Sequence, residues 1–64
     1  MTDIDKKIIR AMCECDLSAS RAAKKLYYTR QNVYRHINDI RFETGLDCLK
    51  FYDAVELLEM IKEE

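Results

Sequence analysis

Side chains that can form paired hydrogen bonds are concentrated between residues 30 and 38 of this chain. Gln31 and Asn32 can each bond to both polar groups on the edge of an adenine, and Arg30 or Arg35 can do the same with guanine. The set that we expect on the outer side of one helix is Arg30, Gln31, Asn32, Tyr34, Arg35 and Asn38. These residue types predict contact with the bases or backbone of double-stranded DNA. The alternative is an ordinary exposed polar face.

A second group of residues suits phosphate rather than bases. Ser20, Arg21, Lys24 and Thr29 carry hydroxyl or cationic side chains, which bind phosphate together with the amides at helix N-termini. Residues 18–41 hold six Lys or Arg and one acidic residue, whereas the rest of the chain holds five and eleven. The net charge of −1 therefore hides a basic segment, which favours an anionic partner.

The sequence contains no pattern for catalysis or metal binding. His36 is the one histidine, and neither a nucleophile with a suitably spaced base nor a glycine-rich loop is present. The three cysteines, Cys13, Cys15 and Cys48, are odd in number, and a Cys-x-Cys pair on a helix points to two different faces. We therefore expect no enzyme activity, metal, cofactor or small-molecule ligand, and thiols that are small buried side chains in a reducing cytosol.

Membrane insertion is not expected either. No apolar run approaches the roughly 18 residues of a membrane span, and no signal peptide is present. We expect a cytoplasmic protein without membrane contact.

The elements that must position these residues are helices. With no Pro and one Gly among 64 residues, the chain predicts an all-α fold, a small helix-turn-helix bundle of four helices in a single domain over 1–64. A first, structural helix begins after Thr2, and Asp5 three residues later gives a capping box. The apolar stripe predicted for this helix consists of Ile4, Ile8, Ala11, Met12 and Cys15.

The basic segment contains two helices joined by a short turn. Ser18 is the expected N-cap of a helix over 19–26, and Thr29 that of a recognition helix over 30–44, which ends at Gly45. A last helix is expected over about 51–62. Ala23 and Val33, ten residues apart, fit the close crossing of a helix-turn-helix. The turn often holds Gly where this chain has Tyr27, a residue that is strained if its φ is positive.

The residues from Ser18 to Asp47 resemble a known family. The Ser18-Ala19-Ser20 entry, the Ala22-Ala23 pair, the Arg30-Gln31-Asn32-Val33 opening and the Thr44-Gly45-Leu46-Asp47 exit are similar to the C-terminal helix-turn-helix of PucR/CdaR-type bacterial transcriptional regulators. The Fis-type helix-turn-helix is a more distant likeness. The resemblance implies sequence-specific DNA binding and a role in bacterial transcription regulation. It also implies either a free-standing member or a piece of a longer sensor protein.

The last helix carries more apolar residues than one core-facing stripe needs. They are Phe51, Ala54, Val55, Leu57, Leu58, Met60 and Ile61. Phe42 adds an aromatic side chain opposite the core face of the recognition helix. We expect a homodimer whose interface contains Phe42, Leu57, Met60 and Ile61. Such a dimer would set two recognition helices about 34 Å apart on an inverted repeat.

Two other functions remain open from the sequence. One is a protein-interaction module that docks on polymerase or another regulator through Phe42 and the last helix. The other is an RNA-binding helical module. Substitution of Gln31 and Arg35 separates the first from DNA binding, and competition between duplex and single strand separates the second.

Overall fold

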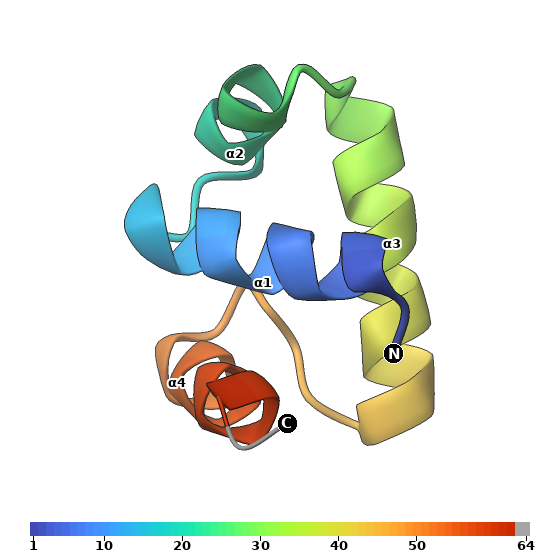
Figure 1. Ribbon diagram of the computed structural model, residues 1–64, viewed down its shortest axis with the longest axis vertical. Coiled ribbons are helices and arrows are strands. Elements are labelled where there is room, and N and C mark those ends of the chain that lie inside the picture. The colour runs from blue at the N-terminus through green and yellow to red at the C-terminus, as the bar shows by residue number, and fades with distance from the viewer. Residues whose placement is uncertain (63–64) are drawn as a thin grey trace.

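The computed structural model describes residues 1–62 and confirms the all-α class (Figure 1). Its helices are α1 (Asp3–Glu14), α2 (Ala19–Leu26), α3 (Arg30–Thr44) and α4 (Phe51–Lys62). The bounds of α2, α3 and α4 agree with the sequence expectation. The last two residues of the expected 1–64 domain lie outside the described part of the chain.

The helix ends are set by the predicted capping residues. The Thr2 and Asp5 side chains each accept a hydrogen bond from the other residue's backbone N–H, both at 3.1 Å, so the capping box is complete. The hydroxyl of Thr29 accepts from the backbone N–H of Asn32 at 3.1 Å and caps α3. Ser18 caps α2 in the same way, and Gly45 ends α3 with a φ of 77°. Local sequence therefore determines where these helices begin and where α3 ends.

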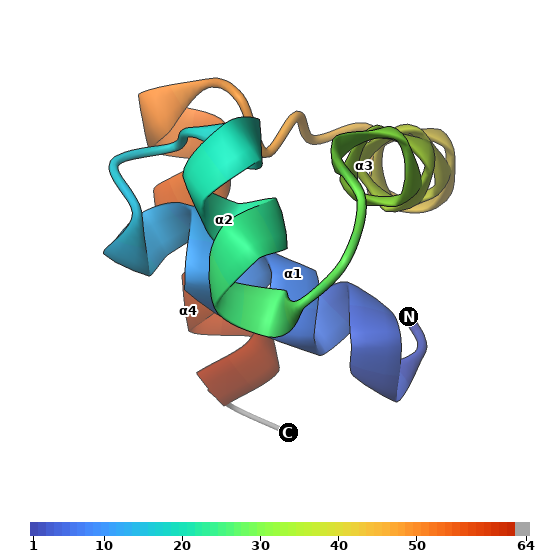
Figure 2. The ribbon, with the colours of Figure 1, turned by 90° about the horizontal axis from the view of Figure 1, so that it is seen from above.

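α1 is the central element of the bundle. It packs against α2, α3 and α4, while α2 and α3 also pack against each other. Figures 1 and 2 show α1 crossing the molecule, with α3 seen almost end-on in the second view. The largest fully buried side chains at the centre are Ile8, Ile9, Met12, Val33, Ile37, Ile40, Cys48 and Leu57. One small core thus holds the two helices of the basic segment at a fixed angle.

The apolar stripe predicted for α1 is partly wrong. Ile4 is 40% exposed and Cys15 is only half-buried, whereas Ile9 and the carboxylate residue Asp5 are buried. The reason is that α1 contacts three other helices and buries a face wider than one i, i+4 row. Ile8, Ala11 and Met12 are buried as expected.

Two residues expected at a dimer interface belong to the core instead. Leu57 is 0% exposed and Ile61 is 4% exposed, because both point from α4 toward α1. Met60 and Phe42 are exposed, at 39% and 96%. The apolar arc of α4 is wide, as the sequence predicts, but the apolar residues that it leaves exposed include Phe51, Val55 and Met60 and not Leu57 or Ile61.

Three non-glycine residues outside the helices have positive φ. They are Asp16 at 57°, Leu17 at 62° and Tyr27 at 59°. Asp16 and Leu17 form the α1–α2 connection, and Tyr27 ends α2. Over residues 1–62, no helix is both long and apolar enough to cross a membrane.

Candidate nucleic-acid interface

The connection between α2 and α3 is a tight turn of three residues. Tyr27 adopts the left-handed conformation (φ 59°, ψ 34°), at the place where Gly often occurs in this motif. Its N–H bonds to carbonyl oxygens of the last turn of α2, and the N–H of Tyr28 bonds to the carbonyl of Ala23 at 2.8 Å. The Tyr27 side chain is 96% exposed, so its ring makes no packing contribution that offsets the strain. The turn is defined by backbone hydrogen bonds rather than by burial of Tyr27.

The buried residues of α2 and α3 are small or branched, as the crossing requires. Ala22 and Ala23 in α2 and Val33 and Ile37 in α3 are all at most 4% exposed. Alanines let the backbones approach, and the branched side chains fix the crossing angle. The opposite side of α3 consequently points to solvent.

Every sequence-predicted DNA-contact residue is exposed. We name as the outward face of α3 the residues Arg30, Gln31, Asn32, Tyr34, Arg35 and Asn38, all of which are exposed. The predicted phosphate-binding residues Ser20, Arg21, Lys24 and Thr29 are exposed as well. Exposure makes these side chains available for binding, but a folded protein exposes most of its polar residues in any case. Evidence for a binding site must therefore come from the chemistry around these residues.

The N-terminal turns of α2 and α3 contain no acidic residue. Carboxylates are favoured there because they offset the positive end of the helix dipole and bond to its free amides. In α3 the cation Arg30 takes the first helical position instead, and in α2 Arg21 lies in the first turn. Both helix ends therefore combine free amides with cationic side chains, a combination that binds phosphate.

Two cations of α2 already have partners within the chain. The predicted phosphate-binding residue Arg21 lies 3.5 Å from Asp16. Lys25, which is not a predicted site residue, lies 3.4 Å from Glu14 and so points back to α1. These exposed pairs are weak and leave the cations accessible.

Asn38 is engaged in a similar way, because its Oδ1 accepts a hydrogen bond of 3.1 Å from Arg41. Within residues 1–62, no hydrogen bond or ion pair is formed by the side chains of Lys24, Arg30, Gln31, Asn32, Tyr34 and Arg35. The first half of the outward face of α3 is thus free to bind, whereas the side-chain oxygen of Asn38 already accepts a hydrogen bond from Arg41.

The buried carboxylate of Asp5 in α1 contacts His36 in α3, and the sequence did not predict this contact. Oδ1 of Asp5 lies 3.0 Å from Nδ1 of His36, and the Asp5 side chain is 7% exposed. The contact joins the start of α1 to the middle of α3, next to Arg35. From the sequence, Asp5 is predicted only to cap α1 and His36 is given no catalytic or metal-binding role, because nothing local connects positions 31 residues apart.

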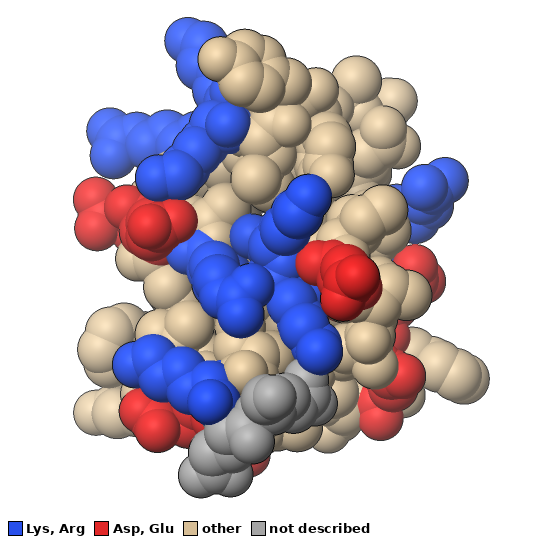
Figure 3. All heavy atoms as spheres, viewed as in Figure 1, with Lys and Arg blue, Asp and Glu red and all other residues tan. Residues whose placement is uncertain are grey.

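The cationic surface extends beyond the basic segment. On the face shown in Figure 3, Lys and Arg side chains gather over α2 and continue across α1. The cations of α1 are Lys6, Lys7 and Arg10, and together with Asp3 they line one shallow hollow. The sequence assigned α1 a structural role only, but its surface adds to the positive field beside α2.

Burial makes two of the three thiols, Cys48 and Cys13, less reactive than a free thiol. Burial raises the pKa of the Cys48 thiol to about 12 from an ordinary value of 9.0, and nearby Asp47 adds to the shift. Burial also raises the pKa of Cys13, whose Sγ lies 3.8 Å from the carbonyl oxygen of Ala54. The His, Cys, Asp and Glu residues in the described part of the chain form no group that could hold a metal ion.

Comparison of the chain with protein-family models, with curated proteins and with solved structures found no match.

Proposed function

We propose that this chain binds double-stranded DNA through α2 and α3, and that it is a small bacterial transcriptional regulator or the DNA-binding part of one. The observation that carries the proposal is the N-terminal half of α3. There, free hydrogen-bonding side chains suited to bases adjoin a helix end without acidic residues. The resemblance of residues 18–47 to the PucR/CdaR-type helix-turn-helix supports the same function in the cytoplasm.

In the proposed complex, the phosphate backbone is bound first. Lys24, Arg21 and the hydroxyls of Ser20 and Thr29 contact phosphates together with the amides that begin α2 and α3. These contacts set the position of α3 in the major groove but read no sequence. Most of the affinity, and its dependence on salt, comes from this group.

Sequence recognition is assigned to the outward face of α3. Gln31 and Asn32 in its first turn are suited to adenine, and Arg30 or Arg35 to guanine. Tyr34, which is 43% exposed, lies beside them. The Asp5–His36 contact holds the middle of α3 against α1, so that Arg35 projects from a fixed backbone.

The test is fluorescence anisotropy with a labelled duplex obtained by binding-site selection. The double variant Gln31→Ala with Arg35→Ala removes two base-contacting side chains, at about 1–3 kcal/mol each. Lys50→Ala is the matched control, since it removes an exposed cation from the α3–α4 loop. We expect the double variant to lose at least about tenfold in affinity, and Lys50→Ala to bind like the parent chain.

Circular dichroism shows whether each variant keeps its helices. Unchanged binding by a folded double variant would contradict the proposal. It would favour a protein-interaction module, for which the relevant observation is the exposure of Phe42 and Phe51, 96% and 65%. Stronger competition by single-stranded RNA than by duplex DNA would instead favour the RNA-binding alternative.

A further inference from the structure

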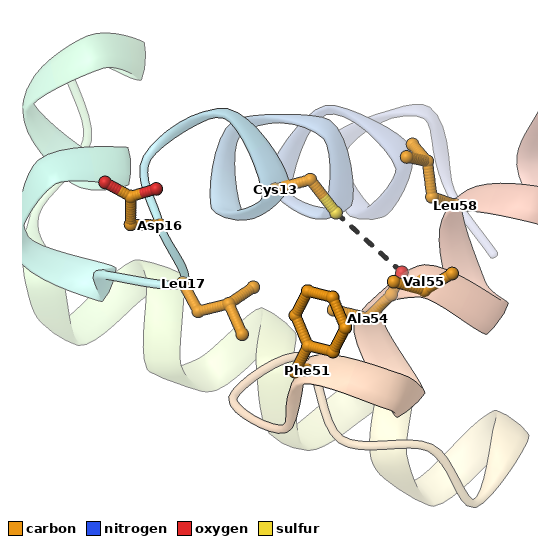
Figure 4. A pocket seen from close by; sticks show the side chains of 7 residues that line it. All are labelled: Cys13, Asp16, Leu17, Phe51, Ala54, Val55 and Leu58. Carbon is orange, nitrogen blue, oxygen red and sulfur yellow. Dashed lines mark hydrogen bonds between the residues drawn. The ribbon is translucent and has the colours of Figure 1, made fainter.

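An apolar groove of about 410 Å³ lies between the end of α1 and the first half of α4 (Figure 4). We call it the α1–α4 groove. Its apolar lining is Cys13 and Leu17 on one side and Phe51, Ala54, Val55 and Leu58 on the other. The helix-to-helix packing of α4 is with α1 alone. One flank of α4 therefore stays uncovered within residues 1–62.

Large apolar side chains at this groove are exposed to water, which is energetically unfavourable. Phe51 is 65% exposed and Val55 is 41% exposed. The ring of Phe51 packs edge-on against Tyr52, with centroids 5.4 Å apart, and Tyr52 is itself 84% exposed. A contiguous apolar patch of this kind marks an interaction surface, whereas isolated exposed apolar residues do not.

Charges of opposite sign lie beyond the two ends of the apolar strip on α4: Asp16 at the groove and Lys62 one turn after Leu58. Asp16, whose side chain is 88% exposed, lines the end next to Leu17 and Phe51. On α4 the strip of Phe51, Val55 and Leu58 continues to Lys62 at i+4 spacing, and Lys62 is exposed. A rim of one sign would fit a partner of the other sign. A rim with an anion at one end and a cation at the other is complementary to itself.

We infer that the occupant of the α1–α4 groove is a second copy of this chain. A twofold axis across the strip sets the two α4 helices antiparallel, so that each Phe51 packs against the groove of the other copy. The same axis places Asp16 of each copy next to Lys62 of the other. In the dimer, Asp16 would exchange its contact with Arg21 for one with Lys62 of the other copy. The Asp16–Arg21 pair is exposed and weak, so losing it costs little.

This surface differs from the one expected from the sequence. Phe42 borders a hollow with Thr2 and Asp5, at the start of α1, whereas the groove lies at the end of α1. The two sites lie at opposite ends of α1, whose 12 residues span roughly 18 Å at 1.5 Å per residue. Phe42 therefore does not extend the apolar patch at the groove.

The inferred dimer has a consequence for DNA that rests on the proposed function. In Figure 4 the ribbon of α3 lies behind the groove, so pairing through the groove leaves the two α3 helices on opposite sides of the dimer. Each copy then binds its own duplex segment. The half-sites of one inverted repeat, about 34 Å apart, would not be bound together.

Sedimentation equilibrium tests the association without DNA. We expect dimers of the parent chain at high micromolar concentration. Val55→Glu, which puts an anion into the groove, should raise the dimer Kd by at least about tenfold. Met60→Glu is the matched control, because Met60 is equally exposed at 39% but lies away from the groove-lining side of α4. It should leave the Kd unchanged.

Charge reversal tests the register. Asp16→Lys sets cation against cation and Lys62→Glu sets anion against anion at both contacts, so each variant alone should associate more weakly than the parent chain. An equal mixture of the two restores opposite charges at both contacts and should form heterodimers. A monomeric parent chain, a Val55→Glu variant that associates normally, or a mixture that stays monomeric would each overturn the inference.

Folding is checked for every variant by circular dichroism, and duplex binding is measured separately. Val55→Glu should bind a single duplex with the parent affinity, because the groove is remote from α3. A parent chain that dimerises but does not bind DNA would sink the proposed function and leave the inferred dimer standing.

Discussion

The α2–α3 pair and the α1–α4 pair treat the positive ends of their helices in opposite ways. α1 has Asp3 and Asp5 in its first turn and α4 has Asp53, whereas α2 and α3 have no acidic residue there. An acidic residue in the first turn stabilises a helix by about 0.3–1 kcal/mol. The α2–α3 pair forgoes this stabilisation, and its helix ends remain attractive to an external anion.

The two pairs also differ in their apolar surface. α2 and α3 bury small and branched residues and expose mainly polar ones, and the large apolar or aromatic side chains that α3 exposes are Tyr34 and Phe42. α4 buries Ala54, Leu57 and Ile61 and still exposes Phe51 and Val55. One pair is thus suited to a polyanion and the other to a protein surface, and the following predictions test that division.

The largest effect is expected from shortening a side chain in the α1–α4 core. Leu57→Ala should lower the free energy of unfolding by about 2–5 kcal/mol, which is most of the stability of so small a domain. Met60→Ala, on the exposed side of the same helix, should cost far less. Urea denaturation followed by circular dichroism measures both. Equal losses for the two variants would mean that Leu57 is not a core residue.

The thiols should differ strongly in their rates of alkylation. Raising the pKa of Cys48 from 9.0 to about 12 lowers its thiolate fraction near neutral pH roughly a thousandfold. A pulse of iodoacetamide with peptide mapping should therefore label Cys48 last. Because the folded thiol holds its proton to higher pH than the unfolded one, stability should fall as pH rises from 9.0 toward 12. Rapid labelling of Cys48 in the folded chain would contradict its burial.

Local signals in the sequence were sufficient for most of the fold. Thr2, Ser18 and Thr29 as caps and Gly45 as a helix end rest on short-range chemistry, and the structure places them as predicted. Periodicity could not say which part of α4's wide apolar arc faces α1. Leu57 and Ile61 were consequently assigned to a dimer interface, although both are buried.

The candidate site was harder to predict where it depends on long-range contacts. The exposure of Gln31 and Arg35 follows from the position of Val33 on the same helix. The Asp5–His36 contact and the closeness of the α1 cations to α2 follow only from how the helices pack. A single sequence carries no signal for such contacts.

Replacing an amide by a carboxylate of the same shape tests whether the N-terminal end of α3 binds DNA. Asn32→Asp adds a carboxylate to the first turn of α3 and should raise stability by about 0.3–1 kcal/mol. It should also weaken duplex binding about tenfold or more, because the anion faces DNA. Asp3→Asn is the mirror variant on α1, and it should lower stability without weakening DNA binding. Unchanged DNA affinity for Asn32→Asp would place the start of α3 away from the duplex.

The smallest effect concerns the turn at Tyr27. Tyr27→Gly removes the Cβ from a left-handed residue and should raise the free energy of unfolding by up to about 1 kcal/mol. Tyr27→Ala removes the ring but keeps the Cβ, so it should not stabilise the chain. Thermal unfolding distinguishes the two. If both variants stabilised the chain, the exposed ring of Tyr27 and not its left-handed backbone conformation would be the destabilising feature.

Titration of the chain into a labelled duplex at several salt concentrations tests whether α2 and α3 bind DNA. We predict nanomolar-to-micromolar affinity at about 50 mM salt and a steep linear fall of log affinity with log salt toward about 200 mM. The slope should flatten by about one unit in Lys24→Ala. If the folded chain binds neither selected nor random duplexes at about 50 mM salt, the proposed DNA-binding function is wrong.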